Sequence, residues 1–162
     1  MATILIGIGN PVLTDDSVGL KIAAALRERL PGETAMATAD LHCGGMRLME
    51  TMVGYDRAII IDAMVSGGRP GTIHALDAAD LERTRNGHST HDGSLAVALE
   101  LGRMAGLLLP REIHIWAVEA GDVQSFSEDL TPAVAQAVPR VVARVMRQLH
   151  ASDPVSPQRT SL

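Results

Sequence analysis

Four residues of this chain combine a reactive side chain with a position at the end of an expected strand or near the start of an expected helix. Asp16 comes just after the first apolar strand, Asp62 closes a central strand, and His91 opens the helix that follows a polar loop. Two carboxylates and one imidazole suit a borderline divalent ion such as zinc or nickel, with water filling the open positions. Asp40, at the end of another expected strand, is a candidate general base or a residue that supports a metal ligand.

Each of these residues also has a purely structural interpretation. Asp15 and Asp16 stand where a helix begins, and carboxylates there commonly serve as N-cap or first-turn residues. Asp40 and Asp62 can each cap the turn that follows a strand. The helix after the polar loop has three alternative N-caps, any of which would leave His91 without a role: Ser89, Thr90 and Asp92. Residue types and spacing alone therefore leave both interpretations open.

The glycine turn near the start of the chain does not match a nucleotide-binding loop. The dinucleotide pattern G-x-G-x-x-G begins at Gly7 and Gly9 but requires a third glycine where Val12 stands. No Gly-Lys-Ser/Thr follows, and Asp15 and Asp16 would repel a pyrophosphate. These features argue against a nucleotide-dependent enzyme.

The elements that position these residues alternate between apolar strands and amphipathic helices. This alternation predicts a single three-layer α/β domain, with a mostly parallel, twisted sheet of about five strands and helices on both faces. Parallel strands end at one edge of a sheet, so Asp16 and Asp62 should share that edge, and His91 reaches it if the loop 80–91 crosses there. We expect strands at 3–8, 34–40, 57–62, 72–76 (at a sheet edge) and 112–118, and helices at 16–30, 46–53, 92–108 and 131–150.

The last expected helix begins with Pro132 after a Thr131 cap, and Pro139 should kink it or mark a later start. The domain should span residues 1–150, and the Ser/Pro-rich segment 151–162 is predicted to be a disordered tail.

Composition excludes several classes of protein. The chain has 162 residues and a net charge of −5 without a basic run, which argues against nucleic-acid binding. No apolar run approaches the ~20 residues of a membrane span, and the first residues lack the pattern of a signal peptide. The single cysteine, Cys43, excludes an internal disulfide and is interpreted as a buried structural residue. We expect a cytoplasmic protein.

Several motifs, in order over about residues 3–149, resemble those of the hydrogenase maturation proteases. They are Gly7-x-Gly9-Asn10-x-x-x-x-Asp15-Asp16-x-x-Gly19, Asp40-Leu41-His42-Cys43-Gly44-Gly45-Met46-x-Leu48, the strand ending in Asp62-Ala63, Ser89-Thr90-His91-x-x-x-Leu95, and Leu130-Thr131-Pro132-x-Val134. Two positions depart from the family pattern. Asp16 stands where glutamate is frequent, and Ser94 occupies the glycine position of the family's His-x-x-Gly-Leu.

The resemblance implies a C-terminal processing endopeptidase of nickel–iron hydrogenase large subunits. The family's metal-binding residues correspond to Asp16, Asp62 and His91, which would recognise nickel already inserted in the large-subunit precursor before its C-terminal extension is removed. Nickel would arrive with the substrate, although zinc or another divalent ion could occupy the free protein. No serine nucleophile motif is visible, so an aspartyl-type or metal-dependent endopeptidase is expected, with Asp40 as an additional catalytic candidate. The alternative is a non-catalytic, nickel-dependent docking or metallochaperone module for hydrogenase assembly.

Overall fold

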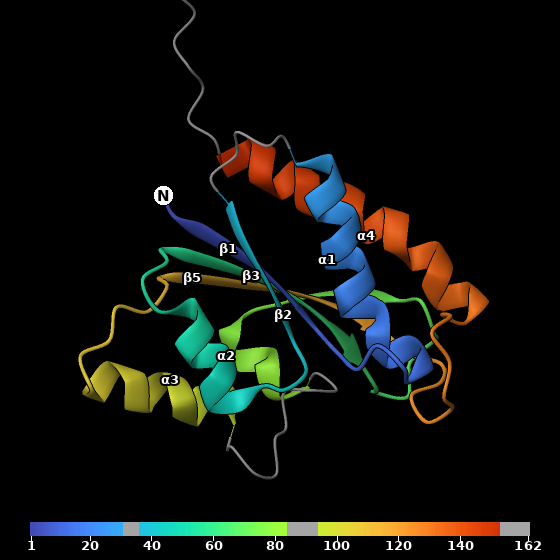
Figure 1. Ribbon diagram of the computed structural model, residues 1–162, viewed down its shortest axis with the longest axis horizontal. Helices are drawn as coiled ribbons and strands as arrows, with labels where there is room; N and C mark the ends of the chain where they lie inside the picture. Colours follow the sequence, from blue (N-terminus) through green and yellow to red (C-terminus); the bar gives the residue numbers. More distant parts are fainter. Residues whose placement is uncertain (31–35, 84–93, 153–162) are drawn as a thin grey trace, which may run out of the picture.

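Five strands form one sheet in the order β2-β1-β3-β5-β4 in the computed structural model, which describes residues 1–30, 36–83 and 94–152 (Figure 1). Strands β2, β1, β3 and β5 are parallel, and β4 pairs with β5 in the antiparallel direction. The strands are β1 (Thr3–Ile8), β2 (Met36–Leu41), β3 (Arg57–Met64), β4 (Ile73–Leu76) and β5 (Glu112–Glu119). The helices are α1 (Val18–Arg29), α2 (Gly45–Met52), α3 (Leu95–Met104) and α4 (Pro132–Ser152), with two 3₁₀ segments, η1 (Thr14–Ser17) and η2 (Ala78–Arg83).

The two central strands are apolar over most of their length because both of their faces are covered. Every residue of β1 and β3 is buried, whereas the edge strands β2 and β4 alternate between partly buried and exposed residues. Continuous apolar runs are typical of parallel strands that are packed on both sides. The sequence-based prediction of a mostly parallel sheet within a three-layer domain is confirmed, as is the position of the 72–76 strand at an edge.

Helices α1 and α4 cover one face of the sheet, and α2 and α3 cover the other (Figure 1). On the first face, Leu5, Ile59 and Ile61 pack with the apolar sides of α1 and α4. On the second face, Ile6 and Ile60 pack with residues of α2 and α3. Alternate residues of each central strand therefore enter different cores, as the period of two in a strand requires.

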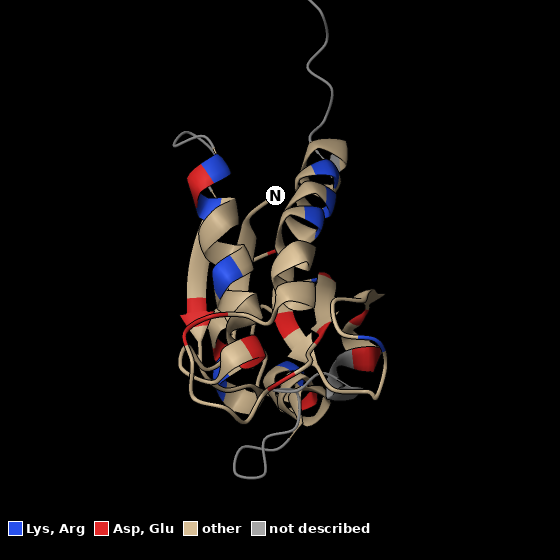
Figure 2. Cartoon of the chain, turned by 90° about the vertical axis from the view of Figure 1, so that its right-hand side faces the viewer, with Lys and Arg blue, Asp and Glu red and all other residues tan. Residues whose placement is uncertain are grey.

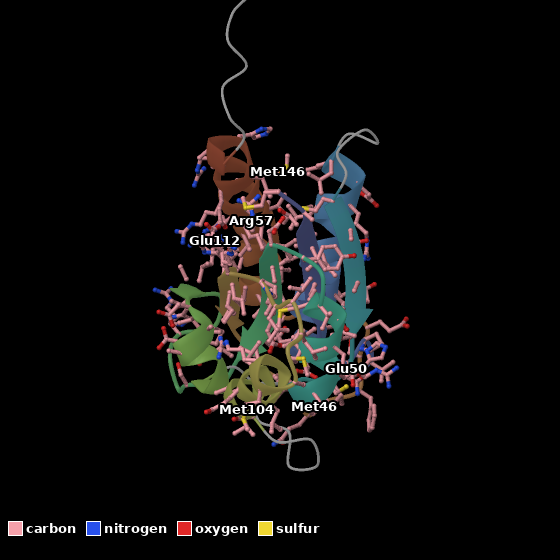
Figure 3. The ribbon with its side chains drawn as sticks, turned by 90° about the vertical axis from the view of Figure 1, so that its left-hand side faces the viewer. Met46, Glu50, Arg57, Met104, Glu112 and Met146 are labelled. Atoms are coloured by element: carbon pink, nitrogen blue, oxygen red, sulfur yellow. The ribbon has the colours of Figure 1, made fainter. Side chains whose placement is uncertain are left out.

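The amino ends of the strands carry charged residues of their own, at the opposite end of the sheet from the Asp residues considered above. Arg57 and Glu112 lie side by side there, as register partners at the starts of β3 and β5 (Figure 3). Arg57 is buried, and its Nε donates a hydrogen bond to Thr3 Oγ1 over 3.2 Å. At this edge, the buried guanidinium of Arg57 therefore links β3 to β1.

Several expected boundaries were wrong by a few residues. β3 continues to Met64, so Asp62 lies inside the strand rather than closing it, because pairing with β5 continues to the register Met64–Glu119. The first helix begins as the 3₁₀ segment Thr14–Ser17 and becomes α-helical only at Val18. α3 begins at Leu95 rather than at Asp92, since the hydroxyl of Ser94 accepts a hydrogen bond from the Val97 N–H and caps the helix.

α4 begins at Pro132, as expected, and runs through Pro139 without a later start. Pro139 is on the exposed side of the helix, while Val134, Ala137 and Val141 on its other side are buried in the core. The packing of this apolar side offsets the hydrogen bond that proline removes. His91, Asp92 and nearly all of the expected tail at 151–162 lie outside the described residues, apart from the last residues of α4. Within the described part of the chain, no helix has the length and apolar character needed to cross a bilayer.

Candidate functional site

The strand order changes direction between β1 and β3. The chain moves outward from β1 to β2 on one side, and then continues from β3 toward β5 on the other side. In open α/β sheets, ligands bind in the crevice at the carboxyl ends of the two strands on either side of such a switch point. Asp16 follows β1 and Asp62 lies near the end of β3, so both come from the strands that border this crevice.

Asp16 is held in η1 by a close approach between the glycine turn and the start of α1. Its side chain is buried, and its Oδ2 accepts a hydrogen bond from the Asn10 N–H over 3.2 Å. A Cβ atom at Gly9 would collide with the carbonyl oxygen of Asp16. A Cβ atom at Gly19 would likewise collide with the carbonyl oxygens of Ile8, at the end of β1, and of Ile61 in β3. The two glycines of the turn and helix therefore allow η1 to lie directly against both strands.

Asp62 is a buried carboxylate in the sheet itself. It is 1% exposed, and its Oδ1 accepts a hydrogen bond from the Ala63 N–H over 2.8 Å. In the strand register, Asp62 is level with Ala117 of β5 and His74 of β4, so the three residues form one row across the sheet. Residues in such a row share a face of the sheet, so Asp62 and His74 lie on the same face, on either side of Ala117.

Asp15 has a carboxylate whose hydrogen bonds join distant segments of the chain. It is fully buried, and its carboxylate accepts hydrogen bonds from the backbone N–H groups of Gly121, Asp122 and Thr131 at 2.8–2.9 Å. The Thr131 hydroxyl donates a fourth hydrogen bond over 2.7 Å. Asp15 thus joins the turn after β1 to the loop after β5 and places a negative charge at the N-terminus of α4, where the helix dipole favours it. For Asp15, the structural interpretation is the one that the contacts support.

Backbone contacts reinforce this junction. The Thr14 N–H donates to the carbonyl of Ser127, and the Ser127 N–H donates to the carbonyl of Val12. The Thr14 hydroxyl also donates to the carbonyl of Ser125 over 2.6 Å. Thr14 has a φ of 49°, a left-handed conformation that non-glycine residues seldom adopt. These contacts fix the segment that carries Asp16 against the end of the sheet.

Asp40 lies near the same edge but has a cationic partner. Its two carboxylate oxygens bind the guanidinium of Arg27 at 2.9 and 3.1 Å, on the partly exposed surface between β2 and α1. Asp40, Arg27 and Ser17 line a cavity of about 530 Å³, to which His42 also contributes. The Nδ1 atom of His42 lies 2.9 Å from the carbonyl oxygen of Gly9, and a proton on Nδ1 would make this a hydrogen bond. The cavity therefore opens next to η1 and has both charged and aliphatic walls.

Glu119 is a residue of this edge that the sequence analysis missed. It is the last residue of β5, is 1% exposed, and accepts hydrogen bonds from the Ser66 N–H, the Ser66 hydroxyl and the Gly68 N–H. His74 Nε2 lies 3.5 Å from Glu119 Oε2. Burial alone would raise the pKa of Glu119, but the hydrogen bonds from Ser66 and Gly68 and the charge of His74 outweigh it and hold the pKa below the ordinary value of 4.5. Extending the expected strand by one residue would have revealed a third acid at the end of an expected strand, besides Asp40 and Asp62.

Because the folded state lowers the pKa of Glu119, this carboxylate contributes stability that is complete above pH 4.5 and is lost as the pH falls through the folded pKa. We expect Glu119→Gln to lower the melting temperature at pH 7 and to have a smaller effect at about pH 3. Thermal unfolding of both proteins at the two pH values measures this. An equal loss at both pH values would mean that the charge of Glu119 does not stabilise the fold.

The structure thus places Asp16 in η1 after β1 and Asp62 near the end of β3, at the switch point of the sheet, with Asp40 at the wall of a cavity next to η1. His91 lies outside the described residues, so its position relative to the two acids stays a prediction. Within the described ranges, no three His, Cys, Asp or Glu side chains cluster closely enough to hold a metal ion. Two buried carboxylates fit a divalent ion in donor chemistry, and a third donor would have to come from elsewhere. Figure 2 shows the acidic residues in red, several of them on the loops at this end of the sheet.

The chain is similar to known proteins over most of its length. Residues 20–148 match the model of the family described as "Hydrogenase maturation protease". The chain is 29% identical over 154 residues to the hydrogenase 2 maturation protease of Escherichia coli strain K12, covering 94% of this chain and 93% of that protein.

Solved structures show the same likeness. The hydrogenase maturating endopeptidase HybD from E. coli superimposes with a TM-score of 0.80 at 30% identity, covering 94% of both chains. A [NiFe] hydrogenase maturation protease from Thermococcus kodakarensis, 21% identical, shares the fold with a TM-score of 0.71 over 91% of this chain and 99% of that one. The family model spans most of the described domain, and the likeness to HybD extends over nearly the whole length of both proteins. The chain is therefore an endopeptidase that belongs to the hydrogenase maturation protease family.

Proposed function

We propose that this endopeptidase recognises nickel in the precursor of a nickel–iron hydrogenase large subunit and removes the C-terminal extension of that precursor. The observation that carries the proposal is the pair of buried carboxylates at the switch point of the sheet, Asp16 in η1 after β1 and Asp62 near the end of β3. Family membership supports a hydrogenase precursor as the substrate. We place the reaction in the cytoplasm, as expected from the sequence.

Asp16, Asp62 and His91 are the ligands that we propose for the nickel carried by the precursor. Three protein ligands without a thiolate leave coordination positions open, so groups of the precursor can complete the shell. Such a site would bind free nickel only modestly, and zinc or another divalent ion could occupy it in the isolated protein. A divalent ion next to a peptide bond can polarise its carbonyl or activate a water molecule.

The cavity beside η1 supports a place for the precursor's polypeptide. It is about 530 Å³ in volume and is lined by Ser17, the residue after Asp16, and by Asp40. In this proposal Asp40 acts from the cavity wall as a general base or as a support for a metal ligand. Arg27, 2.9 Å away, orients its carboxylate. A segment bound there would lie next to η1, the segment that carries Asp16.

Cleavage should require nickel in the precursor. We expect a nickel-loaded large-subunit precursor to be shortened by the purified protein, whereas the same precursor produced without nickel stays intact. Mass spectrometry of both forms after incubation measures the size of the product. The control is a nickel-loaded large subunit that already lacks its extension, which should not change in mass.

Two other outcomes are informative. Equal cleavage of the nickel-loaded and nickel-free precursors would mean that the two acids and His91 do not sense nickel. Stable binding of the nickel-loaded precursor without any cleavage would instead support a docking or metallochaperone module.

A further inference from the structure

A groove with three arginine residues lies between the start of β4 and α4. It has a volume of about 470 Å³, and its walls include Arg69, Arg140, Arg144 and Gln136. No acidic side chain is among the residues that line this groove. The groove is therefore positively charged, in a chain whose net charge is −5.

One side of α4 forms the long wall of the groove. Ala133, Gln136, Arg140 and Arg144 are spaced by three, four and four residues, which places them on one face of the helix. From Ala133 to Arg144 the helix rises about 16 Å, at 1.5 Å per residue. α4 has no acidic residue along its length, and Figure 2 shows basic positions in blue and no red on this helix.

The three guanidinium groups have no anionic partner within the described part of the chain. No carboxylate there lies within ion-pair distance of Arg69, Arg140 or Arg144. Arg27, by contrast, is neutralised by Asp40 at 2.9 Å. The groove thus presents charges that an external anion could pair with, and guanidinium groups bind carboxylates with two parallel hydrogen bonds.

The groove is linked to the candidate site by close packing of loops. A Cβ atom at Gly71, on the groove wall, would lie 2.5 Å from the carbonyl oxygen of Ala133, so the loop before β4 lies directly on the start of α4. On the other side of this loop, Pro70 packs against Gly121, which itself donates a hydrogen bond to Asp15. The loop before β4 therefore lies between the groove and the contacts of Asp15 that hold η1.

We propose that this groove binds an acidic, extended segment of the precursor polypeptide while the nickel centre of the precursor engages Asp16 and Asp62. Carboxylates of the segment pair with Arg69, Arg140 and Arg144. A 16 Å wall accommodates about five residues of extended chain at 3.3 Å per residue. The identity of the partner rests on the proposed function, whereas the affinity of the groove for acidic polypeptide does not.

Direct binding tests the groove independently of cleavage. The probe is a fluorescein-labelled eight-residue peptide of alternating glutamate and glycine, and its fluorescence anisotropy is measured at low and moderate salt. We expect binding that weakens with salt and that is about tenfold weaker, or about 1.4 kcal/mol, in the triple variant R69Q/R140Q/R144Q. The matched control R29Q/R103Q/R111Q changes the net charge by the same amount at exposed positions elsewhere and should bind like the wild type.

Three results would overturn the proposal. They are equal binding to the two triple variants, equal binding of a lysine–glycine peptide, and tighter binding of a ten-nucleotide oligothymidine than of the acidic peptide. The last result would identify the groove as a site for nucleic acid.

Cleavage of the nickel-loaded precursor supplies the second measurement. If the segment docks in this groove, the triple variant R69Q/R140Q/R144Q should raise KM about tenfold with little change in kcat, because it removes binding that is equal in the ground and transition states. An unchanged KM together with weakened peptide binding would refute docking of the precursor here. If no precursor is cleaved by the wild type, the proposed function fails, and the peptide titration still decides whether the groove binds acidic polypeptide.

Discussion

Replacement of Asp62 by asparagine is expected to lower kcat/KM for cleavage of the nickel-loaded precursor by about 100-fold or more. The substitution removes the charge of a proposed nickel ligand, while its amide oxygen can still accept the hydrogen bond from Ala63 N–H that Asp62 Oδ1 accepts at 2.8 Å. The melting temperature should change by no more than about 4 °C, which corresponds to about 1 kcal/mol for a domain of this size. Rates of precursor cleavage and thermal unfolding curves measure the two effects.

The opposite end of the same strand supplies a matched control. Asp56 directly precedes β3, and its Oδ2 accepts a hydrogen bond from the Ala2 N–H over 2.7 Å at the amino edge of the sheet. Asp56→Asn should leave cleavage unchanged, because ligands bind at the other edge. A large fall in melting temperature for Asp62→Asn, with the residual folded protein still active, would favour the turn-cap interpretation of Asp62.

Replacement of Asp15 by asparagine is expected to cause the largest loss of stability. The carboxylate of Asp15 accepts four hydrogen bonds in a fully buried position, and the amide of asparagine would direct its NH₂ group at donors of the loop after β5 or of α4. Unsatisfied buried donors cost about 1–3 kcal/mol each, so we expect a loss of about 3 kcal/mol and a fall in melting temperature of about 6–12 °C. Urea and thermal unfolding measure both quantities.

The adjacent acid distinguishes a structural role from a functional one. Asp16→Asn should abolish cleavage with a small change in stability, because the amide oxygen of asparagine can still accept the hydrogen bond that the Asn10 N–H donates to Asp16 Oδ2 over 3.2 Å. If Asp16→Asn destabilised the fold as much as Asp15→Asn, both acids would be structural. If Asp15→Asn proved as stable as the wild type, the four hydrogen bonds would not hold the junction.

The general fold followed from local patterns in the sequence. The apolar run at 57–62 predicted a buried parallel strand, and the expected and observed strands differ mainly at their ends. Such patterns report burial, which is a property of each residue, so they indicate the order and type of elements well. They do not report where pairing stops, which is why β3 and β5 each extend beyond the expected end.

The candidate site was predictable only in part. Asp16 and Asp62 were selected because the carboxyl ends of parallel strands meet, a rule of topology that needs no knowledge of side-chain contacts. The sequence could not show that Asp15 has a structural role while Asp16 is a candidate ligand. The hydrogen-bond partners of Asp15 are 106–116 residues away in the chain. Glu119 was missed since its hydrogen-bond donors come from the loop after β3, and nothing in its own neighbourhood in the sequence indicates them.

The four hydrogen bonds of Asp15 also have a consequence for the order in which the molecule acquires activity during synthesis. The acid that positions the first catalytic candidate emerges from the ribosome early, but its donors at Gly121, Asp122 and Thr131 are made more than a hundred residues later. At 5–20 residues per second this delay is roughly 5–20 s. A nascent chain that stops after β3 would have three parallel strands and yet lack the donors that anchor η1. Proteolytic competence should therefore arise only once the loop after β5 has been made and has closed on Asp15.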